Sequence, residues 1–172
     1  TTTLKVAASV TGENTIPTWR TTANGLESIA TAHNHSFLPL DEIGQADPKQ
    51  VGDALYMLGN GQGKTRMTKT LPSRKPKTRN LLTFSSGEIG LGAYMAQAGI
   101  VQKGGQEVRM PDIPAVPFGS AFGVFETIHG YDSSKEFAQD LEAACLKYHG
   151  SAIDEFLIRL TADRQDKQFD GV

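Results

Sequence analysis

A short apolar run that ends in two adjacent carboxylates is the feature that most constrains the fold of this chain. Residues Phe37 to Leu40 are mostly apolar, and Asp41 and Glu42 follow them directly. The length and composition of the run predict a buried strand. Two acids at the C-terminal end of a buried strand do nothing evident for stability, so the pair indicates a functional site. A second apolar run, residues 80–86, predicts another buried strand.

Helical patterns surround these two strands. Thr22 or Asn24 is expected near the start of one helix, and Asp47 is expected to cap another, with Pro48 at its first position and Gly59 as its C-terminal stop. Residues 106–114 predict a short strand or extended piece. The predicted helices cover residues 1–10, 20–34, 45–61, 87–99, 133–150 and 151–165. This order of elements predicts an α/β layered fold.

The length of 172 residues suits one domain with a real core. We place the core at residues 1–118 and a C-terminal helical part at 119–172, whose first helix begins at Ser133 or Ser134 and ends at Gly150. No apolar run reaches the ~18 residues of a membrane helix, and no signal peptide is evident. The single cysteine, Cys145, fits a reducing compartment, and we expect it in the core of a cytoplasmic protein.

The charge distribution is strongly uneven. The net charge is −2, yet no acidic residue lies between Asp53 and Glu88. Seven basic residues fall in that interval: Lys64, Arg66, Lys69, Arg74, Lys75, Lys77 and Arg79. The alternating polar pattern and the turn at Pro72-Ser73 predict a basic β-hairpin that contacts nucleic acid phosphates. The alternative is a solvated, flexible loop.

The apolar strand with Asp41 and Glu42 fits the Walker B pattern of ATPases. In that pattern the Asp holds Mg²⁺ through its water shell and the Glu orients or deprotonates the attacking water. Ser85 and Ser86, at the end of the second strand, are polar residues of the kind that contact the γ-phosphate in such enzymes. The alternatives are an acidic turn after the first strand and a Ser-Gly turn after the second.

One stretch of the sequence resembles a phosphate-binding loop but does not match the motif. Gly63-Lys64-Thr65 resembles the end of a Walker A motif, but Leu58 occupies the position of its first Gly. That stretch also follows a predicted helix instead of a strand, so we interpret it as a Gly-rich helix cap or a backbone clamp near DNA. We expect the true Gly-Lys to precede Thr1, because residues 1–10 have the helical pattern that follows a Walker A motif.

Three stretches of the sequence together resemble a known protein family. The run "TANGLESIATAHNHSFLPLDEIGQADPKQVGDALYMLGNGQGKTR", together with "SSGE" and "GGQEVRMPDIPA", resembles the ATPase domains of primase-helicases from phages and mobile elements. These domains are akin to the Cch cassette-chromosome helicases and look like MCM-type AAA+ motors. The resemblance extends from Thr1 to about Leu160 and implies an AAA+ type P-loop NTPase core, truncated at its N-terminus, with a presensor β-hairpin and C-terminal helices.

The resemblance also implies roles for individual residues. Thr1 would bind Mg²⁺ together with Asp41, and Thr2 and Ser85 would contact the nucleotide. Glu42 would be catalytic, as would Ser86 as sensor 1, where many AAA+ proteins carry Asn, and Arg109 as a trans-acting arginine finger. The bland alternative for Arg109 is an exposed loop arginine.

The resemblance therefore implies an ATP- and Mg²⁺-dependent DNA helicase motor that assembles into a ring and acts on DNA, single-stranded in our interpretation. Without the upstream Gly-Lys, the chain as given is expected to be nearly inactive. A nucleic-acid-binding module that keeps an ATPase-like fold without turnover is the main alternative, and a non-motor NTPase such as a clamp loader or switch is a weaker one.

Overall fold

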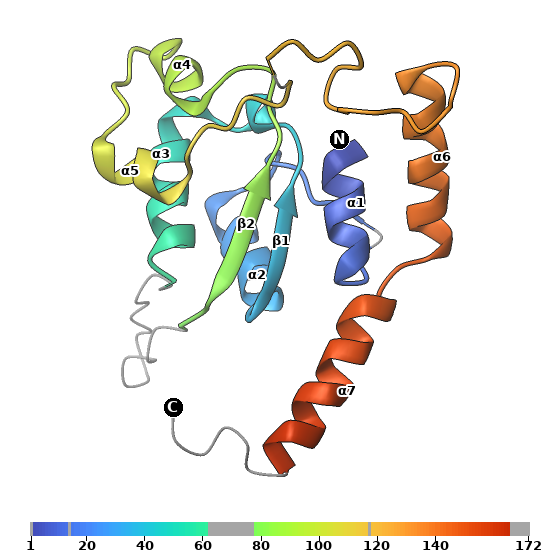
Figure 1. Ribbon diagram of the computed structural model, residues 1–172. Helices are drawn as coiled ribbons and strands as arrows, with labels where there is room; N and C mark the ends of the chain where they lie inside the picture. Colours follow the sequence, from blue (N-terminus) through green and yellow to red (C-terminus); the bar gives the residue numbers. More distant parts are fainter. Residues whose placement is uncertain (1, 14, 62–77, 117, 166–172) are drawn as a thin grey trace. The chain divides into compact units, whose positions relative to one another are not determined.

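The computed structural model describes residues 2–13, 15–61, 78–116 and 118–165. It is a mixed α/β structure with a parallel two-stranded sheet (Figure 1). The strands are β1 (Ser36–Leu40) and β2 (Leu81–Ser85). The helices are α1 (Thr2–Val10), α2 (Ala23–Ala32), η1, a 3₁₀ turn (Ile43–Gln45), α3 (Pro48–Gly59), α4 (Leu91–Ala96), α5 (Gly104–Arg109), α6 (Ser134–Lys147) and α7 (Ser151–Gln165).

The chain divides into two compact units. One comprises Pro17–Ala115, with both strands and α2 to α5. The other comprises Thr1–Ile16 and Val116–Val172, with α1, α6 and α7. The helix α1 thus groups with the C-terminal helices instead of with the strands.

The buried residues of the Pro17–Ala115 unit pack around β1. Leu38 and Leu40 are fully buried, and burial of a leucine side chain contributes about 2 kcal/mol. Trp19 is buried in the same cluster. The other buried members are Leu26, Ala30, Ile43, Val51, Leu55, Leu58, Leu91, Tyr94 and Met95. Buried residues from α2, α3 and α4 thus close around the same strand.

The two strands differ in burial, and only β1 matches the prediction of a buried strand. β1 ends in three buried residues, whereas β2 alternates between half-buried and exposed positions. Leu82 is 70% exposed on β2, so the prediction of a second buried strand is wrong for that face. The outer edge of β1 is partly paired, because Asp41 N–H donates to the Pro17 carbonyl and Trp19 N–H donates to the Asp41 carbonyl.

Several helix boundaries follow local rules and were predicted. Thr22 accepts from Gly25 N–H at the start of α2, and Asp47 accepts from Lys49 N–H at the start of α3. Ser133 accepts from Glu136 N–H and begins α6.

Two local predictions are wrong. Gly59 lies inside α3, and the glycine that ends the helix is Gly61, with φ of +62°. The short strand or extended piece expected over 106–114 begins instead as the helix α5, which ends at Arg109 and is followed by irregular chain. Gln106 explains the difference, because its side-chain oxygen accepts the Lys103 N–H and its buried side chain packs against Gly52 of α3.

Gly61 is required for two reasons at once. Its φ is left-handed, a conformation that favours glycine. A Cβ at this position would also lie 2.2 Å from the carbonyl oxygen of Arg79. The backbone N–H of Arg79 donates to the Gly61 carbonyl and holds the two segments together. Gly99 has a similar φ of +71° but nothing within 4 Å of a built Cβ. Substitution of Gly61 and of Gly99 therefore distinguishes the cost of backbone strain from the cost of a steric clash.

We expect Gly99→Ala to lower the free energy of unfolding by about 1 kcal/mol, from left-handed strain alone. Gly61→Ala should lower it by about 2–4 kcal/mol, since backbone must also move away from the new methyl group. Urea unfolding followed by circular dichroism measures both. Equal losses in the two variants would contradict the role given to the Gly61–Arg79 contact.

Candidate functional site

The C-terminal ends of β1 and β2 meet at the candidate site. The strands pair in parallel with Leu40 opposite Ser85, so the residues that follow each strand emerge at the same edge. Such an edge is where α/β proteins place ligands. The structure therefore brings together Asp41, Glu42, Ser85 and Ser86, all of them half-buried.

Ser86 is bonded to the acidic turn through both its side chain and its backbone. Its hydroxyl donates to Asp41 Oδ1 at 2.6 Å and accepts the Glu42 N–H at 3.0 Å. Its N–H donates to the Leu40 carbonyl, and its carbonyl accepts the Ile43 N–H. A hydrogen bond to a carboxylate is stronger than one between neutral groups, so Ser86 fixes the Asp41 carboxylate in one orientation.

Glu42 adopts an unusual backbone conformation. Its φ of 57° and ψ of 81° are left-handed, which costs a residue with a Cβ of the order of 1 kcal/mol or more. Its carboxylate accepts the Gly44 N–H at 3.1 Å, which stabilises the turn into η1. The Tyr94 hydroxyl holds the same turn through the carbonyls of Gly44 and Ala46. Strain of this kind, held by surrounding contacts, is common at functional sites.

Trp19 contributes to the site in a way that the sequence analysis missed. Its indole N–H donates to Ser85 Oγ at 2.8 Å, and Ser85 Oγ donates to the Ser86 carbonyl. A chain of hydrogen bonds thus runs from Trp19 through both serines to Asp41. The signal was available, because a buried tryptophan needs an acceptor for its N–H.

Asp41 supplies oxygen ligands of the kind that Mg²⁺ prefers, with the Ser86 hydroxyl beside it. Within the residues described, no group of three His, Cys, Asp or Glu side chains is placed to hold a metal ion. Mg²⁺ that is bound with a nucleotide needs only one or two carboxylates, with waters and phosphates completing its coordination. The donor set at Asp41 fits this mode and no dedicated protein cage.

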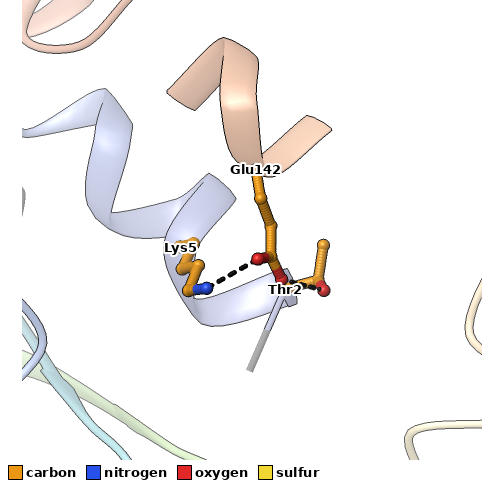
Figure 2. A network of polar contacts seen from close by, with 3 residues as sticks. All are labelled: Thr2, Lys5 and Glu142. Carbon is orange, nitrogen blue, oxygen red and sulfur yellow. Dashed lines mark hydrogen bonds and ion pairs between the residues drawn. The ribbon is translucent and has the colours of Figure 1, made fainter. Parts of the chain in front are cut away.

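Thr2 lies in the other unit and is engaged there. Its hydroxyl donates to Glu142 Oε1 and Lys5 Nζ donates to Glu142 Oε2, both at 2.6 Å (Figure 2). These bonds join α1 to α6 and leave Thr2 occupied by a carboxylate. Thr1, predicted with it, lies outside the described residues.

Arg109 is held by its neighbours on α3 and α5. The guanidinium donates twice to Asn60 Oδ1, at 2.8 and 3.1 Å, and once to the Gly105 carbonyl at 2.7 Å. It also lies 5.1 Å from the centre of the Tyr56 ring. A role in a neighbouring subunit's site would require these contacts to be exchanged.

Arg79 differs from its prediction. The side chain is only 3% exposed and donates to Thr31 Oγ1 and Met57 Sδ, between α2 and α3. In this conformation the guanidinium is enclosed between α2 and α3, and its Nε has no hydrogen-bond partner among the described residues. A contact with nucleic acid would require the side chain to leave this position, so the predicted contact stays a prediction. The other six predicted contacts, Lys64, Arg66, Lys69, Arg74, Lys75 and Lys77, lie outside the described residues, as does the expected hairpin.

A family model described as a domain of unknown function, DUF927, matches residues 1–78. No curated protein and no solved structure matches the chain. The matched range includes β1 with Asp41 and Glu42, but ends before β2 with its two serines. In the described part of the chain, no helix combines the length and the apolar character needed to cross a bilayer.

The Glu142 network predicts how acid affects the α1–α6 contact. Hydrogen bonds from Lys5 and Thr2 lower the pKa of Glu142 from its usual 4.5. A lowered folded-state pKa gives stability that is complete above about pH 4.5 and is lost as the pH falls through the folded value. Thermal unfolding between pH 3 and 6 should show that loss, and Glu142→Gln should remove part of it. The exposed Glu126→Gln is the control, and an equal effect of both substitutions would contradict the assignment.

Proposed function

We propose that this chain carries the Walker B and sensor residues of a nucleotide-hydrolysing DNA motor, of the AAA+ helicase type that the sequence resembles. The observation that carries the proposal is the 2.6 Å contact between Ser86 Oγ and Asp41 Oδ1 at the shared end of two parallel strands. An acid and a polar side chain from adjacent strands at that edge suit a bound triphosphate with its metal.

Each residue at this edge has a defined part. Asp41, together with Thr1, would hold Mg²⁺, which would neutralise charge on the phosphates, and Ser86 would contact the γ-phosphate as sensor 1. Glu42 would accept a proton from the attacking water, because its carboxylate has lone pairs beyond the one used by Gly44 N–H. Ser86 positions Asp41, and Trp19 positions Ser85. A neighbouring subunit of a ring would supply Arg109.

The alternative is a nucleic-acid-binding module without turnover. The engagement of Arg109 with Asn60 and of Thr2 with Glu142 favours it, since both groups would have to be released for catalysis. Hydrolysis assays separate the two functions, whereas nucleic acid binding is expected of both. A cytoplasmic location fits either one.

Substitution of the acidic pair tests the proposal in the full-length gene product. Asp41→Ala should abolish Mg²⁺-dependent ATP hydrolysis. Glu42→Gln should retain nucleotide binding and lower turnover by about 10²-fold or more, because an amide cannot accept the water's proton. Exposed Glu88→Gln is the control. Hydrolysis at the parental rate in Glu42→Gln would refute the catalytic role of Glu42.

Nucleic acid binding is tested by its dependence on salt. Each phosphate contact to single-stranded DNA contributes about 0.7 to the slope of log affinity against log salt concentration. Replacement of Lys69, Arg74, Lys75 and Lys77 by Ala should flatten this slope and weaken binding to every sequence alike. The control replaces four exposed lysines elsewhere: Lys49, Lys103, Lys135 and Lys147. An unchanged slope in the first variant would show that the basic segment does not contact DNA.

A further inference from the structure

A cavity of about 600 Å³ lies between α2 and α3 in the Pro17–Ala115 unit. The two helices pack against each other (Figure 1), and the segment that leads into α2 forms another wall. This volume falls within the range of small-molecule sites in proteins, about 300–1,000 Å³. The cavity is distinct from the Asp41–Ser86 contact, although Trp19 belongs to both places, since it lines the cavity and its N–H donates to Ser85.

The lining of the cavity is mixed in a way that suits an amphipathic ligand. Its apolar side chains are Trp19, Ala23, Leu26, Ala46, Val51, Ala54 and Met57. Trp19, Leu26 and Val51 are nearly fully buried and form its floor. Thr21, Thr22, Asn24 and Gln50 add hydroxyl and amide groups nearer to solvent. An apolar floor below a polar rim is the usual composition of a ligand site.

The charged side chains that line the cavity favour a positively charged ligand. The lining includes the carboxylates of Asp47, Asp53 and Glu27, and no Lys, Arg or His is among the described residues that form it. The Asp47 oxygens accept the Lys49 N–H and the Gln50 amide, and a carboxylate has room for further donors. Asp53 is exposed on α3. A phosphate or other anion would be repelled, whereas a cation would be attracted.

We propose that this cavity binds a small organic cation with an apolar body. The body would replace water over the buried floor, and the cationic end would face the carboxylates of Asp47 and Asp53. The site is independent of the proposed nucleotide site in its chemistry, because a nucleotide carries the opposite charge.

Trp19 makes the proposal directly measurable. It is the chain's single tryptophan, so its indole N–H gives one signal in a ¹H–¹⁵N spectrum. Trp19 lines the cavity and is 3% exposed, so a ligand on the floor would change the surroundings of that one group.

The experiment uses three probes of nearly the same shape: cationic benzamidine, neutral benzamide and anionic benzoate. Benzamidine should shift the indole signal saturably, with a Kd in the millimolar range as expected for so few atoms. Benzamide should bind several-fold more weakly, and benzoate should give no saturable shift. Equal shifts from benzamidine and benzoate, or no saturable shift from any probe, would overturn the proposal.

Two variants test the location and the charge. Ala54→Leu fills the cavity from within α3 with a good helix former, and it should abolish the benzamidine shift while the circular dichroism spectrum is unchanged. Asp53→Asn should weaken benzamidine binding several-fold and leave benzamide binding unchanged, whereas Glu88→Gln, outside the cavity, should alter neither. Persistence of the full benzamidine response in Ala54→Leu, or in Asp53→Asn, would overturn the assignment.

Discussion

The parallel pairing of β1 with β2 is the constraint on which the candidate site depends. Residues of these strands are more than forty positions apart in sequence, and the register places Leu40 opposite Ser85. Every contact of the acidic turn with Ser86 follows from this alignment. A shift of one residue would turn the side chains of β2 to the opposite faces and would separate Ser86 from Asp41.

Sequence patterns predicted the helix starts, because these depend on residues that are neighbours in the sequence. The caps at Thr22, Asp47 and Ser133 each use a side chain within three residues of the N–H that it accepts, so the local sequence narrows each cap to one or two candidate residues. The choice between Gly59 and Gly61 as the end of α3 depends on a contact with Arg79, eighteen residues beyond Gly61, and propensity carries no such information.

Features set by tertiary packing were missed for the same reason. Gly104 and Gly105 are poor helix formers, and α5 exists because Gln106 docks on α3. Arg79 belongs to a basic run by composition, yet its position after α3 and before β2 carries it into the interior. At the candidate site, the acid pair and the serines could be chosen from sequence as residue types, whereas the bond from Trp19 to Ser85 joins segments 66 positions apart.

The Ser86 hydroxyl can donate a hydrogen bond to only one partner at a time. A serine hydroxyl carries one hydrogen, and in this structure that hydrogen is given to Asp41. It cannot be given to a phosphate oxygen at the same time, whereas an asparagine amide, with two hydrogens, could serve both. If a phosphate binds at this edge, as proposed, Ser86 could donate to it only after rotation about the Cβ–Oγ bond has broken the hydrogen bond to Asp41.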